Sequence, residues 1–146
     1  MLTTVLYTAE SVSTGDGRNG HVATTDGRVD LDLAMPPALG GSGEGANPEH
    51  LFASGFAACF HSAIRLVART ENVDVSDSTV TGRVDIGHEV DGALGLAVTL
   101  LVHLPHVAPG TAKELAHAAH QVCPYSRATR GNIPVELRIM DSRDIG

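Results

Sequence analysis

The chain has 146 residues, a hydrophobic fraction of 42% and a charged fraction of 18%, which is the composition of a globular protein and not of a disordered or fibrous one. Its formal net charge is −7, and because no basic cluster is present the sequence argues against nucleic-acid and anionic-membrane partners. The longest apolar or small run, residues 51–60, is about half the ~20 residues that a membrane-spanning helix needs. No basic region of a signal peptide is visible, so we expect a single domain over residues 1–146 in the cytoplasm.

The first third of the chain predicts three strands joined by turns. Residues 3–11 and 29–35 alternate apolar and polar side chains, as strands with one buried face do. Residues 21–25 form a short strand, and the Asp-Gly pair that follows is typical of a hairpin. Residues 15–20 read GDGRNG, which resembles a dinucleotide-binding loop, but that motif must open a helix and a strand follows here. We therefore interpret it as a turn.

A long helix is predicted over residues 48–70. Asn47 is a good N-cap, Pro48 suits the first helical position, and Glu49 complements the helix dipole. Residues 51–64 are apolar or small on nearly every face, which predicts a helix buried on all sides.

The remaining elements are a hairpin, a broken helix and a last strand. Residues 80–88 and 94–104 alternate as two strands around an Asp-Gly turn. A helix from about residue 111 is interrupted by the Cys-Pro pair at 123–124, because proline lacks the N–H that a helix interior needs. Residues 133–139 form the final strand. This order predicts an α+β fold with antiparallel hairpins.

Histidines and cysteines are the candidates for chemistry. His117, His120 and Cys123 are spaced three apart on a helix, so the first and third point ~120° apart and do not converge on one ion. We expect no metal and no cofactor. Cys59 lies about three turns inside the apolar helix, where a free cysteine is usually a small hydrophobic residue. The alternative is a redox pair with Cys123, which requires Cα atoms within ~4.4–6.8 Å; the spacing leaves both interpretations open.

Three segments carry a family resemblance. They are Gly17-Arg18-Asn19-Gly20, Asn47-Pro48-Glu49 with Ala57-Ala58-Cys59-Phe60, and the run from Val122-Cys123-Pro124-Tyr125 to Gly131-Asn132-Ile133. Along essentially its whole length the chain resembles the organic hydroperoxide resistance (Ohr) proteins of the Ohr/OsmC superfamily. The Cys-Pro-Tyr-Ser run favours the Ohr branch over the OsmC branch.

The resemblance implies a fold, a reaction and partners. The fold would be an intertwined homodimer in which antiparallel sheets wrap long buried central helices. The reaction would be a thiol peroxidase cycle: Cys59 attacks the peroxide and Cys123 resolves the sulfenic acid as an intramolecular disulfide, with Arg18 and Glu49 completing the site. The substrates would be organic hydroperoxides, including those of fatty acids, and the reductant a dihydrolipoyl group on a partner protein or another dithiol.

The chemistry explains why an arginine is needed. The nucleophile is a thiolate, burial raises a thiol's pKa, and the helix dipole fades after the first turn. At pH 7.4 a thiol of pKa ~8.5 is roughly 7% ionised, so complete ionisation gains only about fifteenfold. We therefore expect Arg18 to act mainly by stabilising the departing alkoxide, with Glu49 orienting its guanidinium.

One distance needs an explanation. Glu49 and Cys59 are ~15 Å apart along a straight helix, so one Arg18 side chain would struggle to contact both. Either the helix bends near Gly55 or a dimer partner completes the site; we favour the dimer, because a helix apolar on all sides needs more cover than one small sheet gives.

Apolar helix residues could form a pocket that favours alkyl peroxides over hydrogen peroxide, although ordinary core packing is the more common role for each of them. These candidates are Leu51, Phe52, Phe56, Phe60 and Tyr125. Two other functions remain as alternatives: a non-enzymatic peroxide-sensing dithiol switch, and an OsmC-type stress peroxidase with broader substrates.

Overall fold

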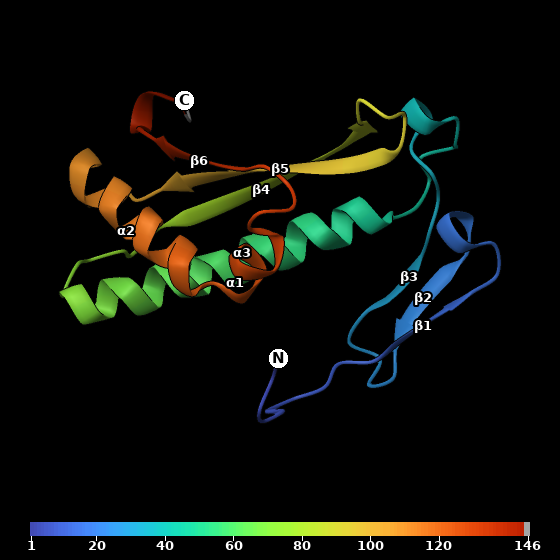
Figure 1. Cartoon of the computed structure of the whole chain (residues 1–146), viewed down its shortest axis with the longest axis horizontal. Coiled ribbons are helices and arrows are strands. Elements are labelled where there is room, and N and C mark those ends of the chain that lie inside the picture. The colour runs from blue at the N-terminus through green and yellow to red at the C-terminus, as the bar shows by residue number, and fades with distance from the viewer. Residues whose placement is uncertain (145–146) are drawn as a thin grey trace. The chain divides into compact units, whose positions relative to one another are not determined.

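The computed structural model describes residues 1–144. The chain forms two compact units, Met1–Leu51 and a second unit that begins at Phe52 (Figure 1). The first unit holds the turn that carries Arg18, and the second holds both cysteines.

The first unit is a small antiparallel sheet. Its strands are β1 (Ser11–Thr14), β2 (His21–Thr24) and β3 (Asp30–Asp32), in the order β1-β2-β3. The predicted Asp-Gly hairpin between β2 and β3 is confirmed, whereas the predicted strand over residues 3–11 is wrong. Residues 1–10 alternate in the way a strand does, but no strand of residues 1–144 pairs with them, and they are exposed.

The second unit is a sheet with helices. Its strands are β4 (Thr79–His88), β5 (Leu94–His103) and β6 (Val135–Met140), in the order β4-β5-β6. The predicted β4–β5 hairpin is confirmed. The pair β5–β6 is parallel, which differs from the all-antiparallel expectation, because the intervening helical segment returns the chain to the end of the sheet from which β5 starts.

Three helices accompany this sheet. Helix α1 (Pro48–Glu71) has the predicted bounds to within one residue, α2 spans Pro109–Val122, and α3 spans Pro124–Thr129. The predicted interruption at the Cys-Pro pair is confirmed, since Cys123 adopts extended backbone angles between α2 and α3. In Figure 1, α1 and α2 run beneath the sheet and α3 lies against α1.

The core lies between the sheet and these helices. Alternate residues of β5 face this core, and α1 and α2 each contribute one stripe of buried side chains. Fully buried core residues include Phe56, Phe60, Ile64, Leu100 and Val102. Strand β4 passes close to α1 at Gly82, where an added Cβ would lie only 2.7 Å from the carbonyl oxygen of Ala53. A residue with a side chain would push the strand and the helix apart.

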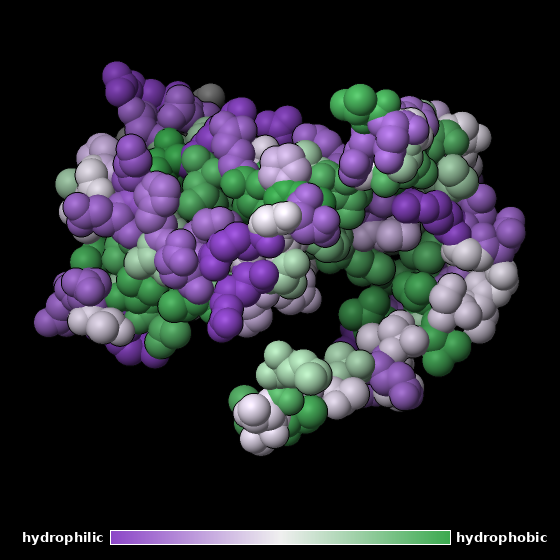
Figure 2. All heavy atoms as spheres, in the orientation of Figure 1, coloured by the Kyte–Doolittle hydropathy of each residue, from purple (hydrophilic) through white to green (hydrophobic). Residues whose placement is uncertain are grey.

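Helix α1 is not buried on all sides, contrary to the prediction. Its buried residues form one stripe, whereas Ser54, Ala58 and Ser62 on another side are exposed and Leu66 is 52% exposed. Figure 2 shows apolar side chains at the surface over α1. By length and hydropathy alone α1 could cross a membrane, but the core helix of a soluble protein passes the same test, so this is weak evidence.

Candidate active site

Two cysteines 64 residues apart in sequence lie in contact. Cys59 is in the middle of α1 and Cys123 is at the junction of α2 and α3, and their Sγ atoms are 3.5 Å apart. Both are free thiols. A disulfide is about 2.05 Å long, so a small closing movement would join them. Cys123 is fully buried, whereas Cys59 is partly exposed, so solvent reaches only the Cys59 residue of the pair.

The broken helix holds Cys123 in place. Helix α2 ends before it because Pro124 cannot continue the hydrogen-bond ladder. The N–H of Cys123 still donates to the carbonyl of Ala119 in α2, and its own carbonyl accepts from the N–H of Arg127 in α3. The thiol is therefore anchored to both helices.

The surroundings of Cys59 disfavour its thiolate. Burial is the main cause that raises the pKa of the Cys59 thiol, and the neighbouring Cys123 thiol raises it further. The backbone N–H of Tyr125 acts in the opposite direction by hydrogen bonding to the sulfur. The thiolate of Cys59 is therefore less favourable than that of an ordinary thiol, and a nearby positive charge would stabilise it.

Arg18 and Glu49 form a two-point ion pair in the first unit. The guanidinium donates from both terminal nitrogens to the two carboxylate oxygens, at 2.8 and 2.9 Å. The Glu49 side chain is 15% exposed and the Arg18 side chain 37%. The hydrogen bonds from Arg18 lower the pKa of Glu49, and those to Glu49 raise the pKa of Arg18. The resemblance had implied that these two residues act together, and the structure places them in one pair.

The turn that carries Arg18 is fixed by its neighbours. Arg18 lies in a 3₁₀ turn, Gly17–Asn19, and the Asn19 side-chain oxygen accepts from the N–H of Met35. At Gly20 an added Cβ would lie 2.1 Å from the carbonyl oxygen of Thr14. Only glycine fits there, which explains the end of the Gly-Arg-Asn-Gly motif.

The helix start that carries Glu49 is capped in both directions. The Asn47 side chain accepts from the N–H of His50, and the Nδ1 atom of His50 accepts from the N–H of Asn47. This is a capping box in which histidine replaces the usual glutamate or glutamine. Sequence reasoning found the Asn47 cap and missed the role of His50, because histidine is not part of the usual capping signal.

The aromatic candidates divide by exposure. Phe56 and Phe60 are fully buried and belong to the core, whereas Tyr125 is 42% exposed and Phe52 is half-buried. The Phe56 ring contacts Phe52 and Tyr125 edge to face, with centroids 6.1 and 5.8 Å apart. Leu51 is half-buried at the end of the first unit. Among the aromatic candidates, Phe52 and Tyr125 are therefore the ones that a bound molecule could touch.

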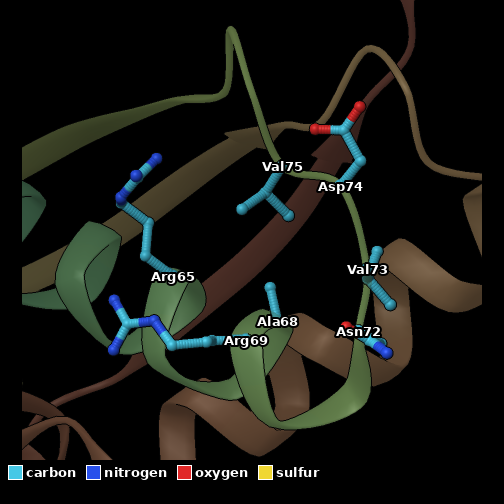
Figure 3. Close-up of a pocket in the computed structure, with 7 residues that line it drawn as sticks. All are labelled: Arg65, Ala68, Arg69, Asn72, Val73, Asp74 and Val75. Atoms are coloured by element: carbon cyan, nitrogen blue, oxygen red, sulfur yellow. The ribbon is translucent and has the colours of Figure 1, made fainter.

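A separate hollow of about 390 Å³ lies at the C-terminal end of α1. Figure 3 shows Arg65 and Arg69 on the helix side and Asp74 and Val75 on the loop that follows. Neither cysteine lines it, so it is not part of the candidate site. Within residues 1–144, no group of three or more His, Cys, Asp or Glu side chains could hold a metal ion.

Comparison with known proteins identifies the family. Residues 41–138 match the OsmC-like protein family. The chain is 44% identical over 135 residues to organic hydroperoxide resistance protein OhrB of Bacillus subtilis, covering 92% of this chain and 98% of that one. The chain belongs to the Ohr proteins of the OsmC-like family. The resemblance read from its motifs is thereby confirmed.

Solved Ohr structures confirm the α+β fold class. A protein from Legionella pneumophila described as an organic hydroperoxide resistance protein OsmC superposes with a TM-score of 0.88 at 46% identity, covering 93% of this chain and 98% of that one. An Ohr protein from Elizabethkingia anophelis, with thiocyanate bound, gives 0.89 at 44% identity over 97% and 100%. The match to the OsmC-like family includes Glu49 and both cysteines of this Ohr chain, and Arg18 lies outside it.

Proposed function

We propose that this chain is a thiol peroxidase that reduces organic hydroperoxides, including fatty-acid hydroperoxides, to alcohols. The observation that carries the proposal is the thiol pair: Cys59 is a partly exposed residue, Cys123 is buried, and their sulfur atoms are 3.5 Å apart. The family name and the Bacillus relative support the substrate class. Because those relatives align over more than nine-tenths of the chain, we also propose that it works as one domain. For its location we propose the cytoplasm, where thiols are kept reduced.

The cycle has three balanced steps. The Cys59 thiolate attacks the outer peroxide oxygen, the O–O bond breaks, and the alkoxide takes a proton, which leaves a Cys59 sulfenic acid and an alcohol. The Cys123 sulfur then attacks the sulfenic sulfur, and water leaves as the disulfide forms. A dithiol reductant gives up two electrons and two protons to restore both thiols and becomes a disulfide itself.

Arg18 supplies the positive charge that this cycle needs. We propose that its guanidinium reaches Cys59, stabilises the thiolate that burial disfavours and then stabilises the charge on the departing alkoxide. The Glu49 carboxylate accepts a hydrogen bond from each terminal nitrogen of the Arg18 guanidinium and so fixes the plane of that group. The carboxylate also offsets part of the positive charge, which is a small cost in thiolate stabilisation.

A second copy of the chain would complete the molecule. Helix α1 leaves uncovered the side that carries the small or apolar residues Ser54, Ala58, Ser62 and Leu66. The N-terminal segment exposes Leu2, Leu6 and Tyr7. We propose a homodimer in which the partner covers this side of α1 and completes the Arg18–Cys59 site. Light scattering on purified protein tests the assembly, and a stable monomer with full activity would rule it out.

The reductant is proposed to be a dithiol, such as a dihydrolipoyl group on a partner protein. With both thiols free, Cys59 is the more exposed cysteine of the pair. We therefore propose that in the disulfide Cys59 receives the first attack and Cys123 is the leaving group. The mixed disulfide that results is then closed by the second thiol of the reductant. A monothiol lacks that internal step, so at equal thiol concentration it should sustain slower turnover.

Phe52 and Tyr125 are proposed as contacts for the organic group of the peroxide. Both rings are at least partly exposed and contact Phe56, and Tyr125 is two residues from Cys123. Cumene hydroperoxide should therefore be reduced faster than hydrogen peroxide. Equal rates would favour an OsmC-type enzyme with broader substrates.

Peroxide consumption with dihydrolipoamide tests the function directly. We expect many turnovers per wild-type molecule and none with Cys59→Ser. Consumption of one peroxide per disulfide, even with reductant present, would make the pair a sensor and not an enzyme. Undiminished turnover by Cys59→Ser would exclude this mechanism.

A further inference from the structure

We propose that Gly55 is a positioning residue for the resolving cysteine. Its missing side chain gives the Tyr125 ring a seat on α1, and that seat holds α3, and with it Cys123, against Cys59. The inference rests on the proposed function for the role of Cys123, but its geometry is independent of any peroxide.

The contact at Gly55 is tight. A Cβ added there would lie 3.2 Å from Cε2 and 3.3 Å from the hydroxyl oxygen of Tyr125. The tyrosine ring therefore rests on bare helix backbone, one turn before Cys59. Glycine is unfavourable inside a helix, and Gly55 is the single glycine of α1, so its place there calls for a packing reason.

Tyr125 is well placed to set the position of Cys123. It is two residues beyond Cys123, in a helix of only six residues. Because Pro124 breaks the helical ladder before α3, side-chain contacts add to the backbone hydrogen bonds of Cys123 in fixing where α3 lies on α1. The Tyr125 ring supplies two of these side-chain contacts, on Gly55 and edge to face on Phe56 at 5.8 Å.

A side chain at position 55 would therefore disturb the sulfur pair. A valine side chain there would push the tip of the Tyr125 ring away from the helix surface. We infer that α3, and with it Cys123, shifts as the ring moves. Since a misplacement of ~1 Å can cost up to about a hundredfold in an intramolecular reaction, the effective concentration of Cys123 at Cys59 should fall.

The equilibrium of the disulfide with dithiothreitol measures this without peroxide. In that exchange the protein disulfide and the dithiol form the protein dithiol and cyclic oxidised dithiothreitol. With Gly55→Val we expect the equilibrium to move about tenfold towards the protein dithiol. Gly110→Val is the matched control, because Gly110 is also helical and an added Cβ there meets nothing within 4 Å; it should leave the equilibrium unchanged.

A double variant distinguishes loss of the Tyr125–Gly55 contact from a general perturbation of helix α1. In a Tyr125→Ala background the ring is gone, so adding Gly55→Val should change the equilibrium by less than about threefold. An unchanged equilibrium in Gly55→Val, or an equal tenfold loss in the Tyr125→Ala background, would overturn the proposal. If Gly55→Val does not fold, Gly55→Ala replaces it, because alanine adds one carbon and favours the helix. We expect the disulfide equilibrium to shift in the same direction by less than in Gly55→Val. An unchanged equilibrium in Gly55→Ala would overturn the proposal. Failure of wild-type peroxide turnover would reject the peroxidase and leave this equilibrium result standing.

Discussion

The Arg18–Glu49 pair and the Cys59–Cys123 pair are held in opposite surroundings. The first is charged, partly exposed and anchored by polar contacts of a turn and a helix cap. The second is uncharged, lies largely within an apolar core and is anchored by a broken helix. The first pair supplies a positive charge but no sulfur, and the second supplies sulfur but no positive charge.

In the proposed mechanism, neither pair suffices alone for peroxide chemistry. The core brings the two sulfurs together and shields Cys123 from solvent, but the same burial raises the pKa of the Cys59 thiol. The ion pair contains a guanidinium that is always charged but has no nucleophile. If the proposed mechanism holds, changes in the thiol pair should stop the cycle, and changes in the ion pair should slow it.

Loss of the resolving thiol should have the largest effect. Cys123→Ser should complete a first turnover and then stop, because an unresolved sulfenic acid proceeds to irreversible sulfinic acid. Mass spectrometry after excess peroxide should show two added oxygens on Cys59. A Cys123→Ser protein that turns over indefinitely with dithiol would contradict the resolving role.

Loss of the positive charge should come next. Arg18→Met should slow the reaction of Cys59 with cumene hydroperoxide by about 10²–10³-fold, as removal of an oxyanion-stabilising donor does. Arg138→Met is the matched control, since Arg138 forms an ion pair of similar geometry with Glu136 in β6. Stopped-flow measurement gives both rates. An Arg18→Lys protein with wild-type thiolate fraction and wild-type rate would refute a specific role for the guanidinium.

Removal of the orienting carboxylate should have a smaller effect. Glu49→Gln keeps the Arg18 charge but loses the two-point contact, so we expect a loss of about tenfold in the same rate constant, with no rise in the pKa of Cys59. Glu136→Gln should be neutral. A rise in the pKa of Cys59 in Glu49→Gln would show that the carboxylate does more than orient.

Acid should weaken the ion pair at a lower pH than usual for glutamate. Arg18 lowers the pKa of Glu49, so the pair contributes its stability above the ordinary glutamate range and loses it as pH falls through the lowered value. Because the pair is partly exposed, that contribution is about 0.5–1 kcal/mol. Urea unfolding at neutral and acid pH should show the wild-type advantage over Glu49→Gln disappear in acid, and a constant advantage would contradict the pairing.

The helix cap should have the smallest effect on catalysis. Asn47→Ala should lower the free energy of unfolding by about 1 kcal/mol, and exposed Ser62→Ala should change it little. Because Glu49 is two residues beyond this cap, peroxidase activity should fall no more than a few-fold. A loss as large as that of Arg18→Met would show that the cap acts directly in the site.

Local sequence signals predicted most of the elements. The Asp-Gly turns, the Asn47 cap and the Cys-Pro break are properties of neighbouring residues, and each is where the sequence placed it. The strand predicted over residues 3–11 failed because alternation is local and strand pairing is not. The burial of α1 was overestimated because an apolar helix face shows what should be covered, and not which chain covers it.

The two halves of the candidate site were harder to predict. No spacing rule joins Cys59 to Cys123 across 64 residues, or Arg18 to Glu49 across 31, since the sheet and helix topology brings each pair together. The family resemblance supplied both pairs. The Tyr125 seat on Gly55 had no sequence signal beyond an unexplained glycine in a helix.

The pKa of the Cys59 thiol tests the central claim most directly. It can be measured from the ultraviolet absorbance of the thiolate in a Cys123→Ser background, with Arg18 intact and with Arg18→Met. If the guanidinium pairs with the sulfur, the pKa is lower with Arg18 present, and the peroxide reaction follows the same titration. Equal pKa values in the two proteins would show that Arg18 does not reach Cys59, and the proposed mechanism would be wrong.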